Sequence, residues 1–99
     1  MGEFRTLVLL ALQRALLGMV TPDLRAVEVA LDGGRVHAIF AYDDDVTDDH
    51  REIVSEVEGM VIGDLDDDVE VQFEAQRVAP PDPVGIVRGT MYCYLRRET

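Results

Sequence analysis

The sequence contains few of the features that mark secreted or membrane proteins. It has a single cysteine, Cys93, which excludes an internal disulfide and favours a reducing compartment. No window approaches the roughly 18 uninterrupted apolar residues that a membrane-spanning helix needs, and the first residues lack the basic region and cleavage site of a signal peptide. These absences predict a cytoplasmic protein without membrane contact.

Signatures of catalysis and metal binding are also missing. The two histidines, His37 and His50, have no neighbouring ligand at metal-site spacing. Residues 43–54 and 64–75 begin with the oxygen spacing of a calcium loop, but neither has the glycine at the sixth position or the glutamate at the twelfth. Cys93 alternates with apolar residues, as a buried structural thiol does. We therefore expect no enzymatic activity, no tight metal site and no cofactor.

What the sequence does have is acidic charge concentrated in one stretch. Residues 43–74 hold fourteen of the twenty acidic residues and one basic residue, Arg51, so this stretch has a net charge of −13, whereas the rest of the chain, with six acids and eight arginines, is at +2. Such a distribution creates a local field that attracts a basic partner and repels phosphate backbones. The charge pattern therefore favours protein binding over nucleic-acid binding.

Apolar periodicity predicts one domain over residues 1–99, a length that suits a single core. Three-and-four spacing predicts helices over about 3–19 and from Thr47 onward. Alternation predicts four strands, over about 24–31, 35–42, 69–76 and 89–97, with Gly33 and Gly34 in a hairpin turn between the first two. The predicted fold is α+β in two layers: a four-stranded antiparallel sheet with two helices on one face and its other face in water, in the order αββαββ.

The predicted core joins the first helix to one face of this sheet. In the last strand, alternation places Cys93 and Leu95 inward and Tyr92, Tyr94 and Arg96 outward. The full set expected to meet the first helix is Val27, Val29, Phe40, Val57, Val71, Phe73 and Leu95.

The second predicted helix carries the most distinctive acidic residues. Asp48, Glu52 and Glu56 follow at four-residue steps, so three like charges stack on one ridge at a cost of about 0.2 to 0.5 kcal/mol per pair. Selection for stability alone would interleave basic residues there, so we interpret the ridge and the preceding loop as a partner-binding surface with no nearby base except Arg51. Its predicted residues are Asp43, Asp44, Asp45, Asp48, Asp49, Glu52 and Glu56. The alternative is that these acids only confer solubility.

The outward side of the last strand is a second candidate surface. Tyr92, Tyr94 and Arg96 would share the open face of the sheet, and tyrosine and arginine are enriched at the energetic centres of protein interfaces. Aromatic residues beside arginine can also stack on nucleic acid, but the net charge of −11 disfavours that interpretation.

Four segments of the chain resemble a family of small bacterial proteins, some of which serve as immunity proteins in contact-dependent growth inhibition and related polymorphic toxin systems. The segments are Gln13 to Gly18, Pro22 to Val27, Glu52 to Glu58 and Tyr94 to Glu98. The resemblance spans nearly the whole chain and implies the order αββαββ and no enzymatic activity. Together with the charge, it predicts an immunity-type protein whose acidic surface neutralises a basic toxin domain, commonly a nuclease. The alternative is a housekeeping or adaptor protein with a solvated acidic helix.

Overall fold

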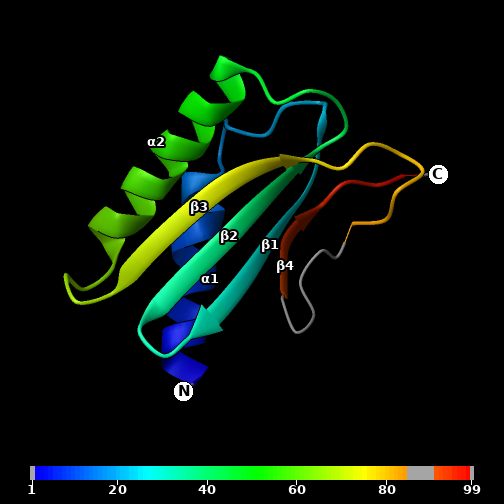
Figure 1. Cartoon of the computed structure of the whole chain (residues 1–99). Helices are drawn as coiled ribbons and strands as arrows, with labels where there is room; N and C mark the ends of the chain where they lie inside the picture. The colour runs from blue at the N-terminus through cyan, green and yellow to red at the C-terminus, as the bar shows by residue number, and fades with distance from the viewer. Residues whose placement is uncertain (1, 85–90, 99) are drawn as a thin grey trace.

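The computed structural model describes residues 2–84 and 91–98 and confirms the predicted α+β order. The two helices are α1 (Gly2–Ala15) and α2 (Asp48–Asp64), and the strands are β1 (Leu24–Asp32), β2 (Arg35–Tyr42), β3 (Glu70–Arg77) and β4 (Met91–Leu95), as Figure 1 shows. The helix α1 ends earlier than predicted because Gly18 adopts a positive φ of 78°, which closes the last turn. Residues 89 and 90 of the predicted last strand lie outside the described residues.

The strands form one sheet in the order β3-β2-β1-β4. Strand β1 is antiparallel to both β2 and β4, but β2 and β3 are parallel, so the sheet is mixed and the prediction of a purely antiparallel sheet was wrong at this pair. The reason is that α2 carries the chain back along the sheet before β3 starts, and such a crossover returns the chain in the same direction. Both helices lie side by side behind the sheet in Figure 1.

The core lies between the helices and the sheet. Five of the seven residues predicted to form it are buried there, namely Val27, Val29, Phe40, Val57 and Phe73. Val71 is partly buried and packs against the same cluster, and the Phe40 and Phe73 rings contribute a tilted pair with centroids 6.1 Å apart. The seventh residue, Leu95, was predicted wrongly, because its side chain is 56% exposed.

A break in the β1–β4 register explains the error at Leu95. Val27 pairs with Tyr94 and Glu28 with Tyr92, so Cys93 is the extra residue of a bulge. The bulge reverses the alternation: Tyr94 packs against the core cluster, while Leu95 lies opposite Ala26 on the other face. Cys93 is half-buried against the same cluster, and burial raises the pKa of its thiol.

The face of the sheet away from the helices is only partly in water, which corrects the prediction of an open face. Ala26 and Ala41 are buried there under Val78, with Val84 packed against them. Arg25 and Glu28 are also buried, although both are charged. Within residues 2–84 and 91–98, no helix has the length and apolarity to cross a membrane.

Candidate partner-binding site

A surface cleft of about 510 Å³ lies between the turn that precedes β1 and the first turns of α2. Its lining is Thr21, Pro22, Asp23, Thr47, Asp49, His50, Glu52, Ile53 and Glu56. Four of these nine residues are acids, and none is an arginine. We call this feature the acidic cleft; it contains three of the seven residues that the sequence predicted for partner binding, Asp49, Glu52 and Glu56.

The start of α2 forms one wall of the cleft through a reciprocal cap. The Thr47 hydroxyl accepts a hydrogen bond from the His50 backbone N–H at 3.2 Å, and the His50 Nδ1 atom accepts one from the Thr47 N–H at 3.1 Å. The cap satisfies two amides that the helix itself leaves unpaired. Because Nδ1 accepts, the imidazole proton lies on Nε2 and is donated to the Asp23 carboxylate at 2.7 Å.

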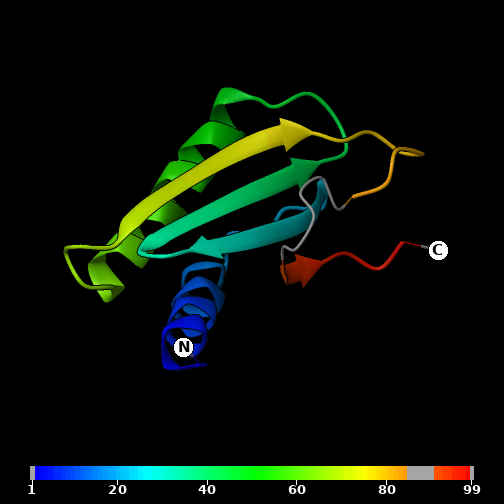
Figure 2. The same cartoon turned by 60° about the horizontal axis from the view of Figure 1, so that its bottom comes forward.

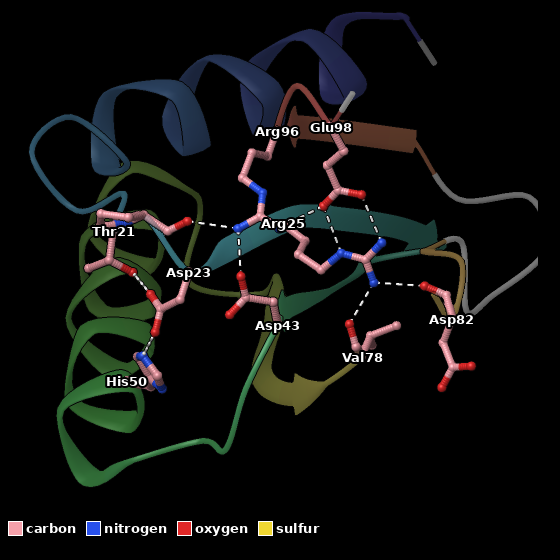
Figure 3. Close-up of polar contacts among 10 residues, drawn as sticks. Thr21, Asp23, Arg25, Asp43, His50, Val78, Asp82, Arg96 and Glu98 are labelled. Atoms are coloured by element: carbon pink, nitrogen blue, oxygen red, sulfur yellow. Dashed lines mark hydrogen bonds and ion pairs between the residues drawn. The ribbon is translucent and has the colours of Figure 1, made fainter. Parts of the chain in front are cut away.

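These contacts fix the charge on Asp23, at the opposite wall. Partial burial acts to raise the pKa of the Asp23 carboxyl, but the hydrogen bonds from the Thr21 hydroxyl and from His50 outweigh it and hold the pKa below its ordinary value. Figure 3 shows Thr21, Asp23 and His50 joined in this row. The cleft is therefore negative at both walls and held in place by a buried histidine.

The row is arranged for support rather than for nucleophilic catalysis. Both ring nitrogens of His50 are occupied, Nδ1 by the Thr47 amide and Nε2 by Asp23, and the Thr21 hydroxyl donates to Asp23 instead of to the histidine. A base that activates a hydroxyl must contact it directly. The His50 ring also stacks on Tyr42, with centroids 4.0 Å apart and an interplanar angle of 19°.

Tyr42 forms the floor beneath His50. Burial, together with the charge on Asp23, raises the pKa of its phenol to about 12. Its hydroxyl has no hydrogen-bond partner among the described residues. The ring thus acts as an apolar support for the imidazole.

The other predicted acids lie outside the cleft, and most of them are paired. Asp43 binds Arg96 at 2.8 Å and Asp45 lies 3.5 Å from Arg77, so the prediction that only Arg51 neutralises this stretch was wrong. Asp48 is fully exposed and pairs with Arg51 within α2 at 2.9 Å. Asp44 accepts a hydrogen bond from the next backbone amide in its own exposed loop. The structure thus splits the predicted set of seven.

Asp43 belongs to a second polar cluster, which we call the arginine seam (Figure 3). The Arg25 guanidinium is 5% exposed and donates two hydrogen bonds to the Glu98 carboxylate, at 2.7 and 2.8 Å. It also donates to the backbone oxygens of Val78 and Asp82. Arg96 joins Asp43, Glu98 and the Pro22 carbonyl on the other side. The seam ties the end of the chain to β1, to the end of β2 and to the 78–82 segment.

The second candidate surface is not a single face. Tyr92 is exposed and lies opposite Glu28 on the side of the sheet away from the helices, but Tyr94 lies on the helix side because of the bulge. Arg96 is held in the arginine seam. The structure therefore does not bring Tyr92, Tyr94 and Arg96 together as one surface.

Sequence reasoning missed Thr21, Asp23 and His50. The Thr47-x-x-His50 spacing could have indicated a cap, since the third helical residue is where a side chain reaches back. Nothing local pairs Asp23 with His50, which are 27 positions apart. In the part of the chain that the structure describes, no group of three or more histidine, cysteine or acidic side chains is placed to hold a metal ion.

The sequence matches the MafI2 immunity protein family over residues 5–98, nearly its full length, and the chain belongs to that family. This confirms the resemblance to immunity proteins. A search among curated proteins found no match to the chain.

Proposed function

We propose that this protein neutralises a cognate toxin by docking its acidic cleft onto a cationic surface of the toxin domain, and that the toxin is a nuclease. The observation that carries the proposal is the set of carboxylates at the cleft. Asp49, Glu52 and Glu56 are exposed, and no ion pair to them occurs within the described residues. Family membership supports a toxin partner in general.

The composition of the cleft suits long basic side chains of a partner. Its rim is acidic, while Ile53 and the buried His50 offer apolar surface below. Arginine and lysine side chains combine an apolar stem with a cationic head, so they match such a gradient. In the complex, the ion pairs between the cleft carboxylates and the partner's basic side chains would be removed from water. Charge complementarity between the two surfaces would then decide which partner binds.

A nuclease target follows from the same chemistry. A protein that cleaves nucleic acid needs a basic groove for the phosphates. A row of carboxylates can bind in that groove in place of the phosphates and so block the substrate. The alternative is a housekeeping or adaptor protein with a solvated acidic helix, which would not need the cleft charges. Family membership favours the immunity role.

The test is protection of cells that express a candidate toxin domain, taken from a toxin gene that neighbours the gene of this protein if one is found there. Cells carrying wild-type protein should survive, and cells carrying the Asp49→Asn, Glu52→Gln and Glu56→Gln triple variant should lose most of the protection. The matched control is the triple variant Asp66→Asn, Asp67→Asn and Asp68→Asn, which removes the same charge from an exposed loop beyond α2. If the cleft variant protects cells as well as the control variant does, the cleft is not the interface. If the toxin kills cells without cleaving their nucleic acid, the nuclease assignment is wrong.

A further inference from the structure

The outward side of α1 carries exposed leucines at regular spacing. Leu7 is 56% exposed and Leu10 45%, and Leu17, in the turn after the helix, is 77% exposed. Glu3 and Arg14 are exposed on the same side. The set Glu3, Leu7, Leu10, Arg14 and Leu17 has the alternating four-and-three spacing of a coiled-coil seam, and we call it the outer stripe.

The outer stripe is not needed by the core of the monomer. The inward side of α1 consists of other residues, Val8, Ala11, Leu12 and Ala15, which are buried in the core cluster together with Leu16 just after the helix. Figure 2 shows α1 projecting from beneath the sheet. Two neighbouring leucines that are about half exposed on one helical seam, flanked by an acid and a base, form a surface suited to another helix.

The charges decide which helix fits. If a second α1 is laid against the first in the antiparallel direction with Leu7 opposite Leu10, then Leu10 lies opposite Leu7 and Glu3 lies opposite Arg14 of the other copy. The leucine contact and the ion pair therefore each form twice, once on each side of the two-fold axis. A parallel pair would also match leucine with leucine, but it would place Glu3 against Glu3 and Arg14 against Arg14, so like charges would oppose each other.

We propose that the Glu3, Leu7, Leu10 and Arg14 side chains of the outer stripe form the interface of a symmetric, antiparallel homodimer of this chain. The 14-residue α1 is only about 21 Å long, so the contact is small and the dimer belongs to the weak, concentration-dependent class. The proposal is independent of the acidic cleft, whose lining residues lie on α2, in the residue 21–23 turn and at Thr47.

Sedimentation equilibrium of the full chain over about a hundredfold range of concentration tests the proposal. The apparent mass should rise from the 11.0 kDa of the monomer towards twice that value. The Leu7→Glu, Leu10→Glu double variant should raise the dissociation constant by at least about tenfold. Circular dichroism checks that the variant is folded, which we expect because both side chains are about half solvent-exposed and lie outside the core cluster. A wild-type protein that stays at the monomer mass at the highest concentration would overturn the proposal.

Leu17→Glu is the matched control. In the antiparallel register Leu17 lies beyond the end of the other copy's helix, so this change should leave the dimer within about twofold of wild type, although Leu17 is the most exposed of the three leucines. If Leu17→Glu is as damaging as the Leu7 and Leu10 changes, the association is a nonspecific apolar contact and the register is wrong.

Charge exchange tests the direction of the helices. Glu3→Arg or Arg14→Glu alone should weaken the dimer several-fold, and the double exchange should restore it, because Glu3 and Arg14 are too far apart along one helix to pair within a monomer. Absence of rescue would overturn the antiparallel register. Retained protection against the toxin by the Leu7→Glu, Leu10→Glu variant would show that dimerisation and toxin binding are separate, whereas lost protection with an unchanged mass distribution would count against this interface.

Discussion

The arginine seam and the acidic cleft both contain acidic side chains, but their surroundings differ. In the seam, Glu98 is shared by the buried Arg25 and by Arg96, and Asp43 pairs with Arg96. In the cleft, Asp23 is held by a histidine and a threonine, while Asp49, Glu52 and Glu56 face solvent without an ion pair in the described residues. The seam closes contacts between distant parts of the chain, and the cleft leaves its charges available.

The comparison teaches that an acidic stretch is not one functional unit. The residue 43–74 stretch contributes Asp43 to the seam and Glu74 to a contact with His37. Its Glu58 accepts a hydrogen bond from the Phe73 backbone N–H, at 2.8 Å, at the edge of the sheet. Only part of the stretch remains for a partner. We infer that stability depends on the seam and partner binding on the cleft, and the predictions below are ordered by their expected effect on stability.

Replacing Arg25 should have the largest effect on stability. The Arg25→Met variant keeps an apolar stem but leaves the Val78 carbonyl without its donor and the Glu98 carboxylate with Arg96 alone. Arg25 is buried while Glu98 is 35% exposed, so the main cost is the unsatisfied Val78 carbonyl and the lost hydrogen bonds of a charged donor, on the order of 3 kcal/mol. Urea denaturation should show a lower midpoint with an unchanged slope, which corresponds to a loss of that size in the free energy of unfolding. A loss below about 1 kcal/mol, the scale of surface substitutions, would mean that the seam does not stabilise the fold.

Replacing His50 should have the next largest effect. The His50→Ala variant loses the bond that the Thr47 N–H donates to the imidazole, the bond to Asp23 and the stack on Tyr42, and we expect a loss of about 2 kcal/mol in the free energy of unfolding. Thr47→Ala removes only the hydrogen bond from the residue 50 N–H to the Thr47 hydroxyl and should cost about 1 kcal/mol. Equal losses from the two substitutions would show that the link from α2 to Asp23 contributes nothing to stability.

Acid should weaken the seam through Glu98. The Arg25 and Arg96 guanidiniums lower the pKa of the Glu98 carboxyl from 4.5 to about 2, with the Arg25 hydrogen bonds as the main cause. A carboxyl whose pKa is lower in the folded state binds its proton more readily after unfolding, so its contribution is present above pH 4.5 and is lost as the pH falls towards 2. The Glu98→Gln variant should therefore show a flatter decline of stability over this range, and an identical pH profile would contradict the role of Glu98.

Neutralising the cleft should have the smallest effect on stability. The Asp49→Asn, Glu52→Gln, Glu56→Gln variant removes repulsion on α2 and breaks no ion pair of the described residues, so its free energy of unfolding should stay within about 0.5 kcal/mol of wild type. Thermal and urea denaturation provide the check. A loss above about 1 kcal/mol would place these acids in the structural role that we assign to the seam.

Local patterns predicted the elements, and non-local contacts decided the rest. Alternation located β1 and β2 and the three-and-four spacing located α1 and α2, since both depend on neighbouring residues. The parallel placement of β3 depends on the direction in which α2 returns the chain to the sheet. The bulge at Cys93 depends on pairing with a strand about 65 positions earlier. Periodicity contains neither piece of information.

The candidate site shows the same division. The sequence predicted the acidic ridge of α2, and the structure places Glu52 and Glu56 in the cleft. It could not predict that Arg96 neutralises Asp43, because the two residues are 53 positions apart. The sequence predicted both Asp48 and Asp49 for the interface, but only Asp49 lines the cleft, which depends on the position of the residue 21–23 turn at the facing wall.

The most direct test of the division between seam and cleft is the rate of association with the toxin domain at several salt concentrations, measured by stopped-flow fluorescence. The cleft variant Asp49→Asn, Glu52→Gln, Glu56→Gln should associate roughly tenfold more slowly than wild type at low salt and lose most of the salt dependence, because local complementarity steers the encounter. The control variant Asp66→Asn, Asp67→Asn, Asp68→Asn, with the same net charge, should stay close to wild type. Equal rates for the two variants would show that only the total charge matters and would contradict the assignment of the cleft as the toxin-binding site.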